Sequence, residues 1–504
     1  MRYRVGGGEQ AAAIWTSPPL PAIFRPSGAT LPLPPRVPLR LRHRVSVALS
    51  LAALPAALHA QTADPRVLER DILKELVEIN TGDSAGHTPE SAKAVARRLA
   101  AAGIPDSDIH ILGYEPRHQS LVARYRGRPS GLKPILLMAH MDVVEARKED
   151  WSFDPFVFKE LDGYYYGRGS SDNKAGIATL VVMFIRYKEE GFVPNRDLIM
   201  VLTADEETTS RSISWLVNEH RDLVDADFAL NTDGGSGSIK DGKAVSFQVQ
   251  TAEKVYLSFQ LEVRNKGGHS SRPEPDNAIY RLAEGLVRLE KFTFPVRLNE
   301  TTRAFFSRSA ATEAPKVAAD MRAVARSADP AAARRLSKEP YYNSLLRTTC
   351  VATRLFAGDA DNALPQLARA TVNCRMLPDD PPDSVEAVLK RVVADTAIHF
   401  SRVAPPTPSP ASPLRPDIMR PVERLVARSW PGVAVVPEMS TGATDGLHTR
   451  NAGIPTYGVG ALFEPIDDIR WHGRDEWVGV KEFQEAAQFW YDLVKALTTA
   501  PPGA

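Results

Sequence analysis

The sequence predicts an α/β protein in which a mostly parallel sheet, with helices on both faces, carries an inserted ferredoxin-like unit. Apolar runs of strand length alternate with amphipathic helical stretches from Asp64 to about Ala252, which is typical of a parallel sheet covered on both faces. A second stretch has the order β-α-β-β-α-β, the ferredoxin-like arrangement. A proline-rich linker, residues 405–413, then leads back to further strand and helix signals.

The first unit is predicted from residue 61 to residue 252. Its expected helices are Asp71–Ile79, Pro89–Ala102 and Lys174–Glu190. Its expected buried strands are Ile135–Met138, Leu198–Thr203 and Phe228–Asn231. In open α/β sheets, ligands and catalytic groups collect at the carboxyl ends of such strands.

The second unit is predicted from residue 253 to residue 404. Its elements are expected in the order Tyr256–Val263, Asn277–Leu289, Thr348–Phe356, Ala368–Met376, Ser384–Asp395 and Ile398–Val403. The stretch from about Arg297 to Ser344 lacks clear periodicity, and we interpret it as a long insertion that is helical in part. Residues 405–500 complete the first unit, with elements expected at Pro421–Ser429, Val433–Val436, Gly453–Val459 and Lys481–Ala496.

Size and charge limit the possible partners. The chain has 504 residues, 43% of them hydrophobic, which is enough for a large core and at least two domains. It carries 62 basic and 61 acidic residues, a formal net charge of +1. This balance supplies no field that would attract nucleic acid or an anionic membrane, so we expect a small-molecule or peptide substrate.

Residues 1–60 are predicted to be an upstream extension followed by a signal peptide. A basic stretch, Arg36–Arg44, precedes the apolar run Val45–Ala57, which is too short to span a bilayer. A cleavage site is expected after Ala60, although Leu58 fits the small-x-small cleavage rule poorly. We expect export to the periplasm or medium, with no stable membrane span after processing. An uncleaved anchor or a disordered tail is the alternative.

Cys350 and Cys374 are the two cysteines of the chain, which excludes a disulfide-dense scaffold. Each lies in an expected strand, and a hairpin centred near Asn362 would place them opposite each other. Export would allow a cross-strand disulfide, but we expect free buried thiols. The chain has no Cys-x-x-Cys spacing, so a metal role for the thiols is not expected.

The strongest chemical signal is the pair Glu206 and Glu207, in the segment Thr203–Glu207 that directly follows the apolar run Leu198–Leu202. Adjacent carboxylates at the end of a buried strand repel each other unless a positive group compensates. A metal ion would supply that charge. The pair therefore indicates a metal-dependent hydrolase site, in which one glutamate holds metal and the other moves protons.

His140 and Asp142 follow another expected strand. The imidazole can ligate zinc through one nitrogen, while the aspartate accepts a hydrogen bond from the other and orients the ring. The alternative is a polar loop. Asp172, ahead of an expected helix, is suited either to capping that helix or to bridging two cations.

Asp233 follows the third expected strand and precedes Gly234-Gly235, so it could complete a ligand set or simply form a turn. A two-metal site usually needs a second imidazole. His448 and His472 are the late candidates, and sequence spacing does not choose between them.

These motifs resemble the zinc aminoacylase/carboxypeptidase group of metallopeptidases, which includes carboxypeptidase G, carboxypeptidase S, carnosinase and the succinyl-diaminopimelate desuccinylases. The resemblance covers roughly residues 65–500 and is closest to the carboxypeptidase S branch in Ala370–Pro378. It is carried, in order, by Met138–Val144, Gly167–Asn173, Ala204–Glu207, Asn231–Gly234, Gly267–Ser271 and His472. The family's zinc exopeptidase-like fold implies a catalytic domain from residues 61–252 and 405–500, with 253–404 as a lid and dimerisation domain.

The resemblance implies two divalent metal ions, with Zn²⁺ as the first choice and Co²⁺ or Mn²⁺ able to use the same ligands. The implied ligands are His140, Asp172 and Asp233 for one ion and Asp172, Glu207 and His472 for the other. Glu206 would be the general base, and Asp142, the second residue assigned to catalysis, would orient the His140 ring. His472 is favoured over His448 because the family's late ligand precedes an acidic segment. A cis peptide is expected at Asp172-Asn173.

Four further positions are implied as substrate contacts: His269, Asn362, Arg375 and Gly442. In the family, the histidine matching His269 reaches an active site that is often in the partner subunit, so a homodimer through the lid domain is one expectation. Arg375 could grip a substrate carboxylate with two parallel hydrogen bonds, the alternative being a surface salt bridge. Gly442 lies in a segment that resembles a substrate loop, although Ala443 replaces the glycine or serine common there.

The sequence therefore predicts an exported dizinc hydrolase that cleaves an amide bond next to a free carboxylate. A carboxypeptidase of short peptides is the main hypothesis, and an N-acyl-amino-acid deacylase uses the same chemistry with a different pocket. A non-catalytic metal- or peptide-binding protein is the alternative of another class. The presence of Glu206 argues against it, because a binding protein has no use for a general base.

Overall fold

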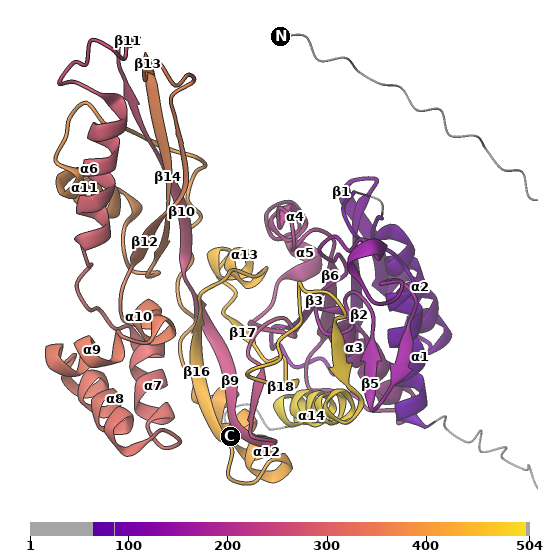
Figure 1. Ribbon diagram of the computed structural model, residues 1–504. Helices are drawn as coiled ribbons and strands as arrows, with labels where there is room; N and C mark the ends of the chain where they lie inside the picture. The colour runs from indigo at the N-terminus through magenta and orange to yellow at the C-terminus, as the bar shows by residue number, and fades with distance from the viewer. Residues whose placement is uncertain (1–63, 85, 500–504) are drawn as a thin grey trace, which may run out of the picture. The chain divides into compact units, whose positions relative to one another are not determined.

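The computed structural model describes residues 64–84 and 86–499. Its largest sheet consists of β1 (Ile109–Glu115), β2 (His118–Tyr125), β3 (Ile135–His140), β6 (Leu198–Thr203), β7 (Phe228–Asn231), β8 (Gly237–Lys240), β9 (Lys243–Glu253), β16 (Ala434–Ser440), β17 (Thr456–Gly458) and β18 (Phe463–Pro465). The strand order is β1-β2-β6-β3-β7-β17-β9-β8-β18, and β16 pairs with β9 (Figure 1). Strands β16 to β18, from late in the chain, therefore join strands from its first half.

The centre of this sheet is parallel, as predicted. Strand β3 pairs in parallel with β6 on one side and with β7 on the other. These are the three runs that the sequence predicts as buried strands, and every residue in them is buried. Because parallel strands end at the same edge of a sheet, His140, Thr203 and Asn231 mark one common edge.

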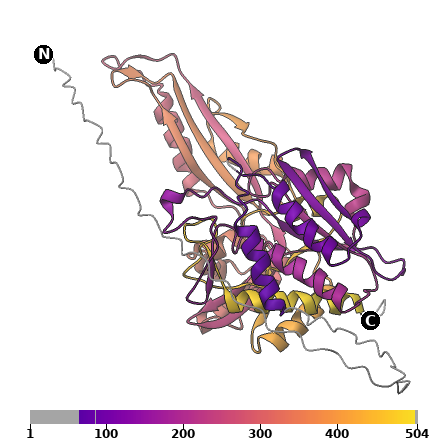
Figure 2. The same ribbon diagram turned by 90° about the vertical axis from the view of Figure 1, so that its right-hand side faces the viewer.

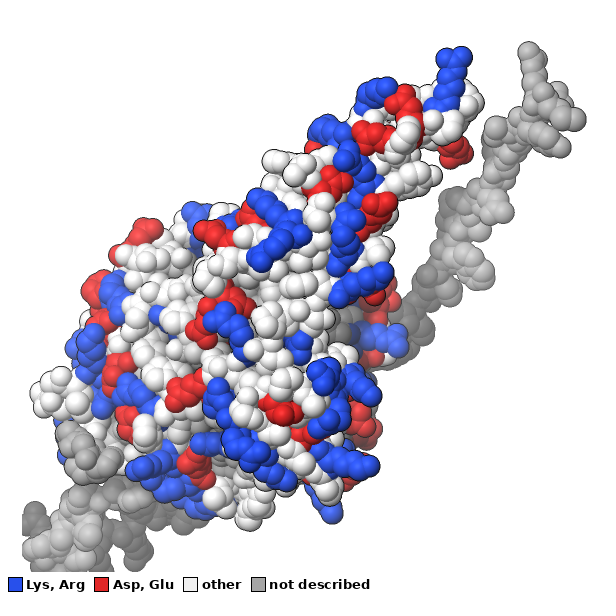
Figure 3. Space-filling view, turned by 90° about the vertical axis from the view of Figure 1, so that its left-hand side faces the viewer, with Lys and Arg blue, Asp and Glu red and all other residues white. Residues whose placement is uncertain are grey.

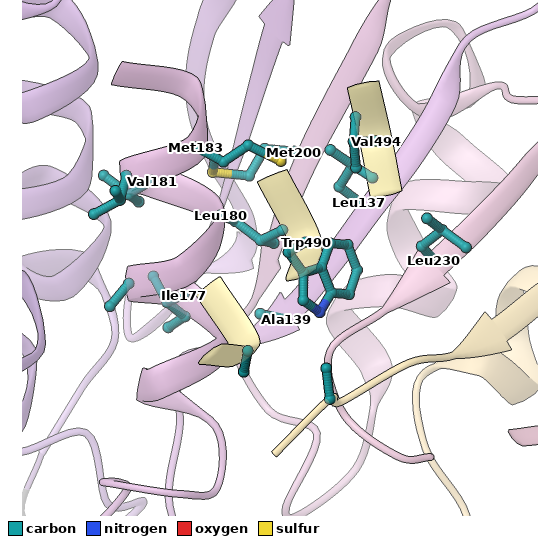
Figure 4. Close-up of a cluster of buried hydrophobic side chains, with 14 of the residues drawn as sticks. Leu137, Ala139, Ile177, Leu180, Val181, Met183, Met200, Leu230, Trp490 and Val494 are labelled. Atoms are coloured by element: carbon teal, nitrogen blue, oxygen red, sulfur yellow. The ribbon is translucent and has the colours of Figure 1, made fainter. Parts of the chain in front are cut away.

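Helices cover both faces of the sheet. One face carries residues of α1 (Pro65–Val77), α2 (Pro89–Ala101), α3 (Lys174–Glu189), α12 (Pro416–Ser429) and α14 (Val480–Thr499). Leu137 and Ala139 of β3 pack on this face with Leu180 and Trp490 (Figure 4). Helix α14, yellow in Figures 1 and 2, contacts both α3 and α12. Leu136 and Met138 point to the other face, where they meet α4 (Arg211–Glu219) and α5 (Arg221–Val224).

A second, antiparallel sheet has the ferredoxin-like chain order that the sequence predicts. Its elements are β10 (Val255–Arg264), α6 (Ala278–Lys291), β12 (Thr349–Ala357), β14 (Leu367–Met376), α11 (Pro382–Val393) and β15 (His399–Arg402). The strand order is β12-β14-β10-β15, which makes β12 an edge strand. Helices α6 and α11 lie on the same side of this sheet and share one apolar cluster with it (Figure 1).

The predicted insertion between α6 and β12 is helical. It folds into α7 (Glu300–Ser309), α8 (Pro315–Ser327), α9 (Pro330–Leu336) and α10 (Pro340–Leu346). The last three each begin with a proline, which is tolerated in the first turn because its missing N–H would have no partner there. These helices form their own apolar cluster, which also includes Val436 and Met439 of β16.

Smaller elements complete the described fold. Strands β4 (Lys159–Leu161), β5 (Tyr164–Tyr166) and β19 (Trp477–Gly479) form one small sheet, and β11 (Gly268–His269) pairs with β13 (Ala363–Leu364) in another. Helix α13 (Gly446–Asn451) precedes β17.

The two cysteines overturn one prediction. Cys350 lies directly opposite Cys374 in the β12–β14 ladder, as the expected hairpin requires. The two sulfur atoms are bonded to each other, so the prediction of free thiols is wrong. The physical reason is the register: opposite partners on one face of an antiparallel pair bring their Cβ atoms within reach of a disulfide.

The predicted export segment lies outside the described residues. Across residues 64–84 and 86–499, no helix combines the length and apolar character needed to cross a bilayer. On the face drawn in Figure 3, acidic and basic side chains are interspersed, in keeping with the near-zero net charge.

Candidate metal centre

The predicted ligands gather at the carboxyl edge of the parallel strands. His140 is the last residue of β3, Glu206 and Glu207 lie just beyond β6, and Asp233 lies just beyond β7. Asp172 stands two residues before α3, whose N-cap is Asn173. The peptide bond between Asp172 and Asn173 is cis, as the family resemblance implies. Thr232 donates a hydrogen bond of 2.7 Å to the Asn173 side chain and so ties this loop to the end of β7.

Two sets of ligand atoms share Asp172. The possible ligand atoms of His140, Asp172 and Asp233 lie within 4.8 Å of one another, and so do those of Asp172, Glu207 and His472. Each imidazole faces a different oxygen of the shared carboxylate. His140 Nε2 lies 2.9 Å from Asp172 Oδ1, and His472 Nε2 lies 3.1 Å from Asp172 Oδ2. His472 Nε2 is also 3.1 Å from Glu207 Oε2.

A third set of possible ligands consists of His140, Glu206 and Glu207. Glu206 is absent from both sets that contain Asp172. The geometry thus separates the adjacent glutamates, because Glu207 shares a set with Asp172 and His472 whereas Glu206 does not.

The electrostatics of this cluster favour bound cations. Burial raises the pKa of Asp233 to about 8, and burial together with the Asp233 carboxylate raises the pKa of Glu206 well above its ordinary value. Hydrogen bonds that the His472 imidazole donates to Asp172 and Glu207 raise its own pKa to about 10. The carboxylates therefore outnumber the positive groups that could neutralise them.

One carboxylate oxygen shows this shortage of positive charge directly. Glu207 Oε1 is buried and has no hydrogen-bond partner among residues 64–84 and 86–499. A buried carboxylate oxygen without a partner is costly unless a cation or water takes it up. Imidazole nitrogens and carboxylate oxygens in this mixture are the donors that zinc and related divalent ions accept. The residues present fit a pair of divalent cations.

The Asp142 carboxylate lies near the His140 ring, as expected, and it also makes contacts that were not expected. Its carboxylate accepts hydrogen bonds from the backbone N–H groups of Glu206 at 3.1 Å and Glu207 at 2.8 Å. The His140 ring nitrogen Nδ1 lies 3.0 Å from the backbone carbonyl oxygen of Asp142, and 3.6 Å from its carboxylate. The Asp142 backbone therefore orients the imidazole, and its side chain holds the glutamate pair in place.

Asp205 is a supporting residue that the sequence reasoning missed. Its carboxylate accepts hydrogen bonds from Tyr114 Oη at 3.0 Å, from Arg211 N at 3.0 Å and from Ser212 N at 2.9 Å. These bonds fix the turn that follows β6 and carries Glu206. The available signal was its place as the first of three consecutive acidic residues, but sequence alone does not reveal which of them turns away from the site.

The structure separates the two late histidines. His472 belongs to a ligand set, whereas His448 lies on α13 and belongs to none of the sets found among the described residues. Burial lowers the pKa of His448. His472 has a backbone φ of 62°, in the left-handed region that non-glycine residues rarely adopt. Such backbone conformations cluster at functional sites.

The four predicted substrate contacts fall into two groups. Arg375 Nη1 donates a hydrogen bond of 3.1 Å to the backbone oxygen of Thr441, next to Gly442. Its guanidinium also lies over the Tyr256 ring, 4.8 Å from the centroid. His269 and Asn362 are close to each other instead, because β11 pairs with β13 and Ser270 N donates to Asn362 O at 3.0 Å.

These two groups lie at opposite ends of β10. Arg375 is opposite Tyr256, near the start of the strand, whereas His269 comes after its last residue. A strand of ten residues spans roughly 33 Å at about 3.3 Å per residue. Arg375 and Gly442 thus form one candidate contact region, and His269 and Asn362 form another.

Known proteins share this chain's sequence pattern and fold. The model of peptidase family M20/M25/M40 matches residues 136–496. Human N-fatty-acyl-amino acid synthase/hydrolase PM20D1 is 29% identical over 386 residues, covering 74% of this chain and 76% of its own. Probable carboxypeptidase S-like 2 of Dictyostelium discoideum is 28% identical over 388 residues, covering 75% and 74%. The M20 family metallo-carboxypeptidase Sso-CP2 of Sulfolobus solfataricus has a similar fold, with a TM-score of 0.64 at 17% identity over 86% of this chain and 99% of that one.

Proposed function

We propose, from the premise that this chain belongs to peptidase family M20/M25/M40, that it is a carboxypeptidase of short peptides with a two-metal centre. The chain is a metal-dependent hydrolase of peptides or N-acyl amino acids. The observation that carries the proposal is the pair of ligand sets that share the Asp172 carboxylate. A bridging carboxylate is the usual ligand between two cations roughly 3.5–4 Å apart.

The proposed ligands are His140, Asp172 and Asp233 for one ion and Asp172, Glu207 and His472 for the other. We propose Zn²⁺ as the native metal, since zinc commonly takes imidazole and carboxylate ligands. Co²⁺ and Mn²⁺ could use the same donors. The orphaned Glu207 Oε1 supports a cation on the second set.

Glu206 is the proposed general base. When bound, two divalent cations supply Lewis acidity toward the scissile carbonyl and lower the pKa of water at the site. Glu206 takes a proton from the attacking water and returns it to the leaving nitrogen as the C–N bond breaks. Its absence from both sets that share Asp172 leaves its carboxylate free for this transfer. Asp142 holds the backbone amides of Glu206 and Glu207, so each glutamate keeps its own direction.

Arg375 and Gly442 are the proposed contacts for the substrate carboxylate. Arg375 bonds a backbone oxygen beside Gly442 and stacks on Tyr256, which fixes its guanidinium while leaving several N–H groups available. Among the described residues no carboxylate forms an ion pair with Arg375. A free terminal carboxylate of the substrate could accept two parallel hydrogen bonds from the guanidinium of Arg375.

An N-acyl-amino-acid deacylase is the second candidate. The amide chemistry is the same, and the human relative that covers 74% of the chain is named as an N-fatty-acyl-amino acid synthase/hydrolase. The two candidates differ in what lies on the acyl side of the scissile bond. Both place a free carboxylate on the other side, where Arg375 is proposed to act.

We also propose that the protein works as a homodimer through the sheet that carries β12. This edge strand exposes Val351, Leu355 and Phe356, an apolar strip that a second copy could cover. His269 lies at the far end of β10 from Arg375, so a partner subunit is the simplest way for it to reach a metal centre. Sedimentation analysis of the protein tests this, and a monomer at micromolar concentration would contradict it.

Export to the periplasm or medium is a further proposal. It rests on the basic stretch and the apolar run Val45–Ala57 in the sequence. Cell fractionation followed by N-terminal sequencing of the mature protein tests it. A mature N-terminus close to residue 61 is expected.

A substrate panel tests the proposed activity. Purified protein with Zn²⁺ is incubated with N-blocked dipeptides, their C-terminally amidated counterparts and N-acyl amino acids, and released amino acid is measured. A carboxypeptidase prefers the first set, and a deacylase prefers the last. Glu206→Gln should retain two ions per chain and lose most turnover. Unchanged turnover in this variant, or no cleavage of any member by the wild type, would overturn the proposal.

A further inference from the structure

The loop that carries Asp172 is held by a buried glutamate from the other end of the chain. Glu476 is 0% exposed and accepts hydrogen bonds with both carboxylate oxygens. Its Oε1 accepts from Ser171 N at 2.9 Å, Ser171 Oγ at 3.2 Å and Asp172 N at 3.1 Å. Its Oε2 accepts from Gly169 N at 3.0 Å and from Arg168 Nη1 at 2.6 Å. Glu476 therefore fixes the segment 168–172, which ends at the shared ligand.

Arg168 connects the same glutamate to the loop that carries His472. Its side chain is 3% exposed and forms the buried ion pair with Glu476. Its second nitrogen, Nη2, donates a hydrogen bond of 2.8 Å to the backbone oxygen of Gly473, the residue after His472. The guanidinium also lies over the Trp151 ring, 5.0 Å from the centroid, so its orientation is restricted.

The backbone explains why the two loops meet. Strand β5 pairs with β19 in antiparallel register, with Tyr166 opposite Trp477. Gly167 leaves β5 just where Glu476 enters β19, and Gly167 N donates a hydrogen bond of 3.1 Å to Glu476 O. The chain therefore brings together two loops that are about 300 residues apart in sequence, each loop carrying one member of the same ligand set.

A purely structural role is the alternative. A buried ion pair is weak support for stability, because the desolvation of both charges offsets much of their attraction. What distinguishes this pair is where its hydrogen bonds go. Beyond the pair itself, the partners of these hydrogen bonds belong to residues 169–172 or to Gly473, next to the proposed ligands.

We propose that Glu476 and Arg168 are positioning residues that lock the Asp172 loop and the His472 loop into one unit, and thereby build the metal site formed by Asp172, Glu207 and His472. This inference rests on the proposed two-metal centre. Neither residue touches a metal or the substrate. The pair sets the distance between Asp172 and His472, on which the affinity of this site depends. The other site, formed by His140, Asp172 and Asp233, takes its remaining ligands from β3 and β7 and depends on the pair less.

Metal titration of apo-protein tests the proposal directly. Zn²⁺ or Co²⁺ alone is titrated into wild-type protein and into Glu476→Gln, and the bound ions per chain are counted after equilibration in a metal buffer. The amide introduced by Glu476→Gln would face hydrogen-bond donors, so one of the two original oxygen positions can no longer accept. Supporting groups around metal ligands contribute about 10- to 100-fold in metal affinity. We expect the site formed by Asp172, Glu207 and His472 to lose affinity by that factor, while the site formed by His140, Asp172 and Asp233 changes less than about threefold.

A second variant tests the same role in case Glu476→Gln misfolds. Arg168→Lys keeps the positive charge, but a single ammonium group cannot bond both Glu476 and the Gly473 carbonyl in the geometry of the guanidinium. We expect the same selective loss at one site, of about tenfold. Thermal unfolding of each apo-variant reports separately on stability.

Asp108→Asn is the matched control. Asp108 is also a buried carboxylate with a bidentate arginine partner, since it accepts from Arg126 Nε at 3.0 Å and Nη2 at 2.6 Å. It precedes β1, an edge strand of the large sheet, and belongs to neither ligand set. This variant should lose stability yet bind both ions with wild-type affinity.

The outcomes test the positioning role separately from the proposed carboxypeptidase activity. Wild-type affinity at both sites in Glu476→Gln or Arg168→Lys overturns the inference, whatever happens to stability. Binding of fewer than two ions by the wild type also overturns it. Two ions in the wild type, a selective loss in both variants and no cleavage of any peptide would support the positioning role and refute the proposed carboxypeptidase activity instead.

Discussion

Replacing Asp142 with asparagine should lower kcat/KM by roughly 30-fold without removing either metal ion. The Asp142 carboxylate accepts the backbone N–H of Glu206 at 3.1 Å and of Glu207 at 2.8 Å, and the side chain is almost fully buried. Asparagine keeps the shape and one acceptor oxygen, but it turns an NH₂ group toward the other backbone N–H. One buried donor is then left without a partner, which costs about 1–3 kcal/mol.

A cost of about 2 kcal/mol corresponds to about 1.5 powers of ten in rate if it is felt when Glu206 transfers its proton. The assay is steady-state hydrolysis of an N-blocked dipeptide at saturating Zn²⁺, together with metal content and thermal unfolding. Asp197→Asn is the control, because Asp197 also accepts a backbone N–H, from Gly127 at 2.8 Å, but lies just before β6, at the opposite end of the strand from Glu206. A change of less than about twofold in Asp142→Asn would refute the reasoning. A loss as complete as that of Glu206→Gln would also refute it, because Asp142 would then take part in the chemistry itself.

Three further predictions concern Arg375, Glu69 and the metal ions. Arg375→Ala should raise KM by roughly 10- to 100-fold for substrates with a free carboxylate and much less for their amides. The reason is that a hydrogen bond to a charged partner contributes about 1.5–3 kcal/mol. Arg369→Ala, on the same strand, is the control and should leave KM unchanged. Glu69→Gln should stabilise the protein by up to about 3 kcal/mol at pH 8 and not at pH 4. Burial raises the pKa of Glu69 to about 7, so the free-energy cost of its buried charge grows as the pH rises from about 4.5 to about 7. Urea unfolding at both pH values checks this, and an equal effect at both would contradict it. Stripping the metal with a chelator should lower Tm, and returning Zn²⁺ should restore it, because ligands that bind the folded state stabilise it by mass action; an identical Tm with and without metal would count against the centre.

The parallel core was predictable because its signals are local. Ile135–His140, Leu198–Thr203 and Phe228–Asn231 are uninterrupted apolar runs, and polar residues follow each of them. Strands β1 and β2 were missed because they mix apolar and polar residues at the edge of the sheet, where one face is partly exposed. Strand β9 was missed for a similar reason, since its glutamines and serine interrupt the apolar pattern.

The cluster of possible ligands was predictable in outline, but the contacts around it were not. Residues that follow parallel strands must meet at one edge, so His140, Glu207 and Asp233 could be grouped from the sequence. The contacts of Glu476 could not be predicted, because they join backbone amides of residues 169–172 to a side chain from the far end of the chain. Nothing in the sequence near Glu476 indicates that its carboxylate turns inward.

The two cysteines show the same limit. The hairpin between β12 and β14 follows from two strand-like runs and a turn, and the sequence predicts it correctly. Whether the thiols bond depends on a register accurate to one residue, because a shift of one residue would place Cys350 and Cys374 on opposite faces of the sheet. Strand signals alone do not fix the register to that accuracy.

The account depends on Asp172 holding two cations at once. Crystals grown with Zn²⁺ and measured at the zinc absorption edge would show this directly in an anomalous difference map. We predict two peaks about 3.5–4 Å apart, one on each side of the Asp172 carboxylate. The first should contact His140 and Asp233, and the second Glu207 and His472. A single peak, or a peak bound by Glu206 in place of Glu207, would contradict the account.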